Sequence, residues 1–127
     1  MMVQKTYLDA QTLLDDSFRL GAKIINDGFK PTYIIAIWRG GTPIGVAVQE
    51  FLAYYGVQSD HIAIRTSSYA DEIDQRAKKV KVHGMDYLIK NIQATDSLLI
   101  VDDVYDTGLT IQAVIAELRD KCRLNTP

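Results

Sequence analysis

The chain has 127 residues, 47% of them hydrophobic, which suits one domain with a buried core. Its formal net charge of −2 gives no electrostatic reason to expect a nucleic-acid or membrane partner. The sequence contains neither a cleavable apolar leader nor a run of membrane-spanning length, which predicts a cytoplasmic protein. Cys122 is the single cysteine and cannot form an intramolecular disulfide, and His61 and His83 lack partners at metal-ligand spacing.

The first predicted helix begins near Thr6 and ends at Asn26-Asp27-Gly28. Its apolar stripe consists of Leu14, Phe18, Ala22 and Ile25. A buried strand is predicted over Tyr33 to Trp38, and Arg39-Gly40-Gly41 breaks it.

A second helix follows this glycine turn, with Thr42 as the predicted N-cap and Pro43 as the first helical residue. Its apolar positions are Ile44, Ala47, Val48, Phe51, Leu52 and Tyr55, and Gly56 can close it. Short strands are predicted at His61 to Arg65 and at Val80 to His83. The charged segment between them, Thr66 to Val80, predicts a loop or loose hairpin that could close over a substrate.

The last predicted strand, Leu98 to Val101, leads into a helix that ends near Lys121. The apolar positions of this helix are Ile111, Val114, Ile115 and Leu118. Strands that alternate with helices predict an α/β fold, a mostly parallel twisted sheet flanked by helices, with ligands at the C-terminal ends of the strands. Both strand-to-helix turns should therefore open at one edge of the sheet.

The segment Leu98 to Thr110 carries the clearest chemical signal. Asp102 and Asp103 follow the apolar run directly, where carboxylates can hold sugar hydroxyls or a metal ion. In Thr107-Gly108-Leu109-Thr110, the glycine allows a sharp turn that aims backbone N–H groups at an anion at the start of the next helix. This order of groups suits a sugar phosphate.

Two other interpretations use the same residues. Aspartate and glycine after a strand often form a plain surface turn. Asp102, Asp103 and Asp106 also spell the DDxxD pattern of prenyl-diphosphate enzymes, which gathers carboxylates for Mg²⁺ on one face of a helix. The aliphatic run before them and the Thr-Gly after them favour a strand and a loop instead.

Taken in order, the strand, the two acidic residues and Asp-Thr-Gly-x-Thr resemble the PRPP-binding signature of type I phosphoribosyltransferases, most of all the hypoxanthine/guanine enzymes. The resemblance covers most of the chain. It implies that Asp102 and Asp103 contact the ribose hydroxyls, with Mg²⁺ nearby, directly or through water. Asp106 would be the acid/base beside purine N7. The 5′-phosphate would be held by Asp106, Thr107, Gly108, Leu109 and Thr110.

Two further segments match the family. Arg39-Gly40-Gly41 resembles its pyrophosphate loop, which often has a cis peptide bond before the glycines; here that bond would join Trp38 to Arg39. The guanidinium group suits pyrophosphate oxygens. Ser68-Tyr69 resembles the Ser-Tyr pair of the flexible loop in hypoxanthine-type enzymes, although an ordinary solvated loop is the alternative.

The sequence departs from the family after Lys121. The family has at least one more strand there and a segment that reads the base, whereas this sequence ends at Pro127. We therefore expect a single phosphoribosyltransferase domain over residues 1–127 that is incomplete at its C-terminus. The uncovered sheet edge predicts self-association or marginal stability. The resemblance implies a dimer or tetramer.

The resemblance implies a Mg²⁺-dependent enzyme of purine salvage that transfers 5-phosphoribosyl from PRPP to a nucleobase, with hypoxanthine or guanine preferred, and releases pyrophosphate. A regulatory protein that senses PRPP without transfer is the alternative from another class, and the missing base-recognition segment favours it. A structural domain with coincidental turns would bind neither PRPP nor ribose 5-phosphate.

Overall fold

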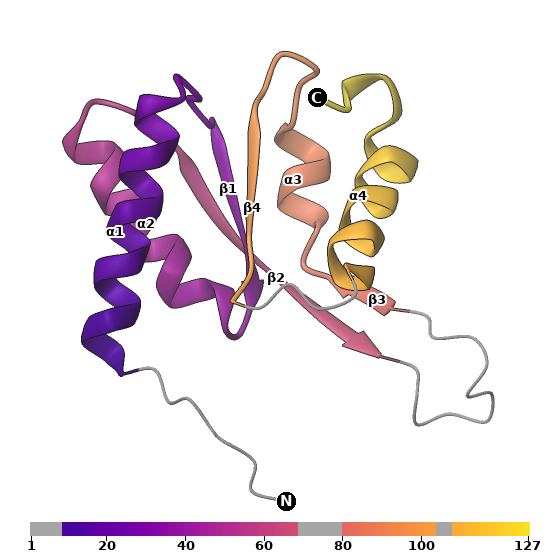
Figure 1. Ribbon diagram of the computed structural model, residues 1–127. Helices are drawn as coiled ribbons and strands as arrows, with labels where there is room; N and C mark the ends of the chain where they lie inside the picture. The colour runs from indigo at the N-terminus through magenta and orange to yellow at the C-terminus, as the bar shows by residue number, and fades with distance from the viewer. Residues whose placement is uncertain (1–8, 69–79, 104–107) are drawn as a thin grey trace, which may run out of the picture.

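The computed structural model describes residues 9–68, 80–103 and 108–127. It has three layers, with a four-stranded sheet between two pairs of helices (Figure 1). The predicted fold class, a mostly parallel sheet flanked by helices, is confirmed. Within the described residues, no helix has the length and apolar character needed to cross a membrane.

The strand order in the sheet is β3-β2-β1-β4, formed by β1 (Tyr33–Trp38), β2 (Asp60–Ser68), β3 (Val80–His83) and β4 (Leu98–Val101). β1 runs parallel to β2 and to β4, whereas β3 pairs with β2 in the antiparallel sense. Because β1, β2 and β4 are parallel, their last residues lie at one edge of the sheet, the C-terminal rim.

Two helices cover each face of this sheet. α1 (Ala10–Asn26) and α2 (Gly41–Tyr54) lie on one face, and α3 (Asp86–Asn91) and α4 (Leu109–Cys122) lie on the other (Figure 1). A short 3₁₀ helix, Arg123–Asn125, follows α4.

Successive residues of β1 are buried on opposite faces of the sheet. Ile34 joins the cluster of α1 and α2, which consists of Ile24, Ile34, Ile44, Val48, Leu52 and Val101. Ile35 and Ile37 join the cluster of α3 and α4, which consists of Ile35, Ile37, Ile64, Met85, Leu88, Ile92, Val114, Leu118 and Cys122. Burial on both faces is the reason that this strand is a continuous apolar run rather than an alternating one.

The helix starts differ from those predicted. α1 begins after Asp9, whose carboxylate accepts a 2.7 Å hydrogen bond from the Thr12 N–H and so caps the helix; Thr6 lies outside the described residues. α2 begins at Gly41 rather than after Thr42. The Arg39 carbonyl accepts from the Thr42 N–H at 3.2 Å and closes the first turn earlier, so Thr42 is not the N-cap.

Tertiary contacts also extend one strand and add one helix. β2 continues beyond the predicted end at Arg65 because its last residues pair with β3, where Arg65 lies opposite His83. Residues 66–68, predicted as part of the loop or loose hairpin, are therefore strand, and residues 69–79 of that segment lie outside the described part. The sequence did not predict α3, whose six residues are too few for a helical period.

His61 on β2 packs against α2. Its Nδ1 lies 3.1 Å from the side-chain oxygen of Gln49, while Nε2 is buried without a hydrogen-bond partner among the described residues. Gly45 allows this approach, since a Cβ there would lie 2.8 Å from Nε2. Burial lowers the pKa of His61 below its usual value of 6.5, and the charge of Asp60 partly opposes this.

We expect the free energy of unfolding to fall as the pH drops below about 6.5. The unfolded chain then protonates His61, whereas the folded chain keeps it neutral until the pH reaches its lowered pKa. Urea unfolding at about pH 8 and about pH 5.5 measures this for the wild type and His61→Asn. Equal losses of stability in the two proteins would contradict the assignment.

Candidate functional site

Two loops meet at the C-terminal rim. The loop after β1 carries Gly40 and Gly41, and the chain after β4 carries Asp102 and Asp103. A Cβ on Gly41 would overlap the Val101 carbonyl oxygen, and a Cβ on Gly40 would overlap the Asp103 carboxylate. The backbone of one predicted ligand segment therefore lies directly against the other, an approach that only glycine permits.

The two aspartates at the end of β4 lie in different environments. Asp102 is half-buried and Asp103 is exposed. The Asp103 N–H donates a 2.8 Å hydrogen bond to the Asp102 carboxylate. Burial raises the pKa of Asp102 above its usual value, and the neighbouring Asp103 side chain adds to this effect. Two carboxylates this close favour a cation or hydroxyl donors between them.

The turn before α4 has the geometry that the sequence predicts for Gly108. This residue is buried, has φ +77° and precedes Leu109, the first residue of α4. Its carbonyl accepts from the Gln112 N–H at 2.9 Å. The first N–H groups of a helix lack partners within it and can bind an anion. Asp106 and Thr107 lie outside the described residues, whereas Thr110 lies in the first turn of α4.

The basic side chains of the rim lie on or directly after β1 and β2. Arg39 is exposed, and the Trp38–Arg39 peptide bond is cis, as the family resemblance implies. Arg65 is exposed near the end of β2, opposite Trp38 in the strand pairing. The ion pairs among the described residues involve neither guanidinium. Ser68 ends β2, and Tyr69 lies outside the described residues.

The donor set at the end of β4 fits Mg²⁺. Among the described residues, no three histidine, cysteine or acidic side chains gather as a metal site. Mg²⁺ is commonly held by one or two carboxylates together with water and the phosphates of a substrate. Asp102 and Asp103 supply two such carboxylates, so the protein part of that ligand set is present.

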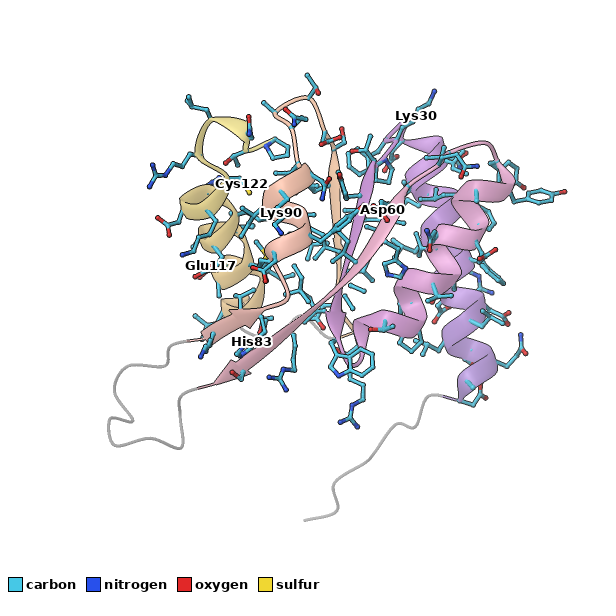
Figure 2. All side chains as sticks on the ribbon, turned by 180° about the vertical axis from the view of Figure 1, so that it is seen from behind. Lys30, Asp60, His83, Lys90, Glu117 and Cys122 are labelled. Atoms are coloured by element: carbon cyan, nitrogen blue, oxygen red, sulfur yellow. The ribbon has the colours of Figure 1, made fainter. Side chains whose placement is uncertain are left out.

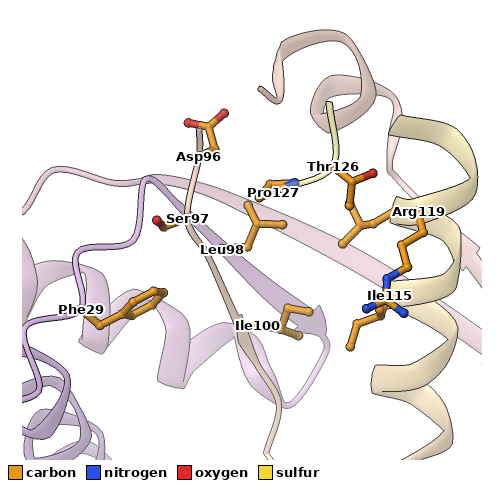
Figure 3. A pocket seen from close by; sticks show the side chains of 10 residues that line it. Phe29, Asp96, Ser97, Leu98, Ile100, Ile115, Arg119, Thr126 and Pro127 are labelled. Carbon is orange, nitrogen blue, oxygen red and sulfur yellow. The ribbon is translucent and has the colours of Figure 1, made fainter. Parts of the chain in front are cut away.

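A cavity of about 310 Å³ lies elsewhere, between β4 and α4 (Figure 3). Its lining is mostly apolar and consists of Phe29, Asp96, Ser97, Leu98, Ile100, Ile115, Leu118, Arg119, Thr126 and Pro127. It reaches the residues at the start of β4 and the last turns of α4, away from Asp102. The rim carries the charged groups and the turn geometry, and it is therefore the candidate site.

The side chains of Arg65 and Trp38 were not among the predicted ligand groups. Arg65 ends a predicted strand, and the C-terminal ends of parallel strands share one edge of the sheet. Its position at the end of a predicted strand could therefore have placed Arg65 at the rim. The pairing that sets Trp38 opposite Arg65 depends on the register of β1 with β2, which the sequence pattern leaves open.

Comparisons with known proteins show the family of the chain. The family model of the phosphoribosyl transferase domain matches residues 3–122. The chain therefore belongs to the phosphoribosyl transferase domain family. No curated protein sequence matches the chain significantly.

Several solved structures share the fold. A hypothetical protein from Neisseria gonorrhoeae with bound ppGpp has a TM-score of 0.77 and 26% identity, over 95% of this chain and 66% of that chain. A purine phosphoribosyltransferase from Pyrococcus horikoshii has a TM-score of 0.68 and 27% identity, over 94% of this chain and 70% of that chain. The hypoxanthine-guanine phosphoribosyl transferase of L. donovani has a TM-score of 0.67 and 22% identity, over 92% of this chain and 69% of that chain. The chain thus spans about two thirds of the length of these proteins.

We expect Gly41→Ala to lower the free energy of unfolding by about 1–3 kcal/mol, because the added Cβ meets the backbone of Val101. Gly40→Ala should cost less, since the side chain of Asp103 can move aside. Urea unfolding compares the two variants. An unchanged or increased stability of Gly41→Ala would show that the two loops do not pack in this way.

Proposed function

We propose that the chain binds PRPP and transfers its 5-phosphoribosyl group to a nucleobase nitrogen, with release of pyrophosphate. Hypoxanthine or guanine is the proposed acceptor, which makes purine salvage in the cytoplasm the proposed role. The observation that carries the proposal is the contact of Gly40 and Gly41 with the segment Val101 to Asp103 at the rim. It joins a loop suited to pyrophosphate to carboxylates suited to ribose.

Each group of the rim then has one task. Arg39 and the N–H groups beside Gly40 and Gly41 would hold the pyrophosphate, and Asp102 and Asp103 would orient the ribose hydroxyls. The helix start at Gly108 to Thr110 would bind the 5′-phosphate. Preorganised groups of this kind stabilise the charges that develop as the bond from ribose C1 to the pyrophosphate oxygen breaks and the bond to the base nitrogen forms.

Two further parts complete the proposed chemistry. Asp106, outside the described residues, would accept the proton that the purine nitrogen loses. Ser68 and Tyr69 would belong to a loop that closes over the substrate. Bound Mg²⁺ would neutralise charge on the pyrophosphate as it leaves.

We also propose that residues 1–127 form one phosphoribosyltransferase domain. The chain covers 66–70% of the length of the neighbours named above. A homodimer or homotetramer is the proposed assembly. Among the described strands, β4 has a neighbour on one side only, which leaves an edge available for pairing.

A second candidate is a regulatory protein that binds PRPP or a related nucleotide without transfer. The Neisseria gonorrhoeae neighbour, at 26% identity over 95% of this chain, holds ppGpp. Such a nucleotide combines a purine, a ribose and pyrophosphate groups, the same chemical groups that the proposed reaction brings together. Binding to the same rim would exclude PRPP.

Titration calorimetry with PRPP in the presence of Mg²⁺ tests the proposal, followed by assays of pyrophosphate release with a panel of nucleobases. We expect PRPP to bind and a purine to release pyrophosphate. Binding without release for any base would select the regulatory candidate, and competition of ppGpp with PRPP would support it further. A chain that binds neither PRPP nor ribose 5-phosphate would contradict both functions.

Asp106→Asn should slow purine transfer by about 10²–10⁴-fold and weaken PRPP binding much less, because it removes the proton acceptor and keeps the other groups proposed to hold the 5′-phosphate. Steady-state kinetics give the rate and calorimetry gives the affinity. Asp86→Asn, on α3 and outside the proposed site, is the control for loss of one carboxylate. Equal losses of rate and affinity would remove the proton-transfer role of Asp106.

A further inference from the structure

Three side chains of the neighbouring strands β1, β2 and β3 form one row near the C-terminal rim. Trp38 on β1 pairs with Arg65 on β2, and Arg65 pairs with His83 on β3. Trp38 is 49% exposed, and Arg65 is exposed as well. Figure 2 shows His83 at the end of the molecule opposite to Asp60, the first residue of β2.

The row lies on the face of the sheet that α2 covers further back. His61 packs against Gly45 of α2, and Arg65, four residues along the same strand, projects to the same side. On β1, Ala36 lies beside Gly45, and Trp38 follows it on that side. Paired residues of neighbouring strands on one face have adjacent side chains.

The Arg39-Gly40-Gly41 loop opens onto this same face. It connects the end of β1 to the start of α2, so it must cross from the sheet to the helical layer on that side. Arg65 thus stands one strand away from the strand that carries Arg39, and neighbouring strands lie about 4.8 Å apart. Asp102 and Asp103 follow β4 on the other side of β1, and the Asp103 carboxylate reaches Gly40 in the loop after β1.

Acidic and basic side chains therefore follow different strands at the rim. The carboxylates follow β4, and two guanidiniums, which form no ion pair with a described carboxylate, lie directly after β1 and near the end of β2. Like charges side by side repel, so Arg39 and Arg65 gain most from an anion with several negative charges between them. Pyrophosphate has that charge, and planar guanidiniums bind its oxygens in pairs.

We propose that Arg65 is a second pyrophosphate-binding residue, which extends the site from the β1 loop onto β2, with Trp38 as its apolar wall. This inference rests on the proposed function for the identity of the substrate, PRPP. Arg65 contacts the pyrophosphate of PRPP and of the product, and it makes no contact with the ribose or the 5′-phosphate. Its contribution is selective for ligands that carry pyrophosphate.

The test measures the affinities of the full chain for inorganic pyrophosphate, PRPP and ribose 5-phosphate by calorimetry with Mg²⁺ present. We expect Arg65→Gln to weaken binding of pyrophosphate and PRPP about tenfold, the loss typical of one charge-assisted contact. Affinity for ribose 5-phosphate should stay within about twofold. Arg65→Lys should recover part of the loss, because the charge remains and the paired hydrogen bonds do not.

Arg119→Gln is the matched control, since it removes the same charge from the cavity beside α4, away from the rim. It should leave all three affinities unchanged. Unchanged binding of pyrophosphate to Arg65→Gln, equal weakening for ribose 5-phosphate, or a wild-type chain that does not bind pyrophosphate would each overturn the inference. A wild type that binds pyrophosphate through Arg65 but does not bind PRPP would contradict the proposed function alone.

Discussion

The close contact between Gly40-Gly41 and the segment Val101 to Asp103 is the constraint on which the rest of this structure depends. It holds the ends of two parallel strands together without side chains between them. Any larger residue at Gly41 would push the start of α2 away from β4, because its Cβ would meet backbone rather than a flexible side chain. A loop and two carboxylates that are more than 60 residues apart along the chain thereby become one site.

The topology of the sheet determines which chemical groups lie near this contact. Parallel strands end at one edge, so each strand brings the residues at its C-terminal end, and those directly after it, to that edge. β4 contributes carboxylates, and β1 and β2 contribute guanidiniums. A ligand with hydroxyls at one end and a highly charged anion at the other suits this order. The apolar cavity between β4 and α4 offers no comparable arrangement of charges.

Most of the fold could be predicted because its signals are local. The buried run of β1 and the helical spacing of α2 and α4 gave elements that the structure confirms. The errors lie where tertiary contacts decide. Thr42 is not the N-cap because the Arg39 carbonyl closes the first turn, and α3 exists because Leu88 enters a core that other elements build. Likewise, β2 extends beyond Arg65 because β3 pairs with it.

The ingredients of the site could be identified from the sequence: a strand before two aspartates, a glycine at a sharp turn before a helix, and an arginine before two glycines. The patterns that indicate strands, turns and helices each extend over a few residues, so they can be recognised in a single sequence. The contact of Gly40 with Asp103 and the pairing of Arg65 with Trp38 became apparent only from the folded structure. These contacts depend on strand order and register. Both are determined by packing between residues far apart in the sequence, so no local pattern predicts them.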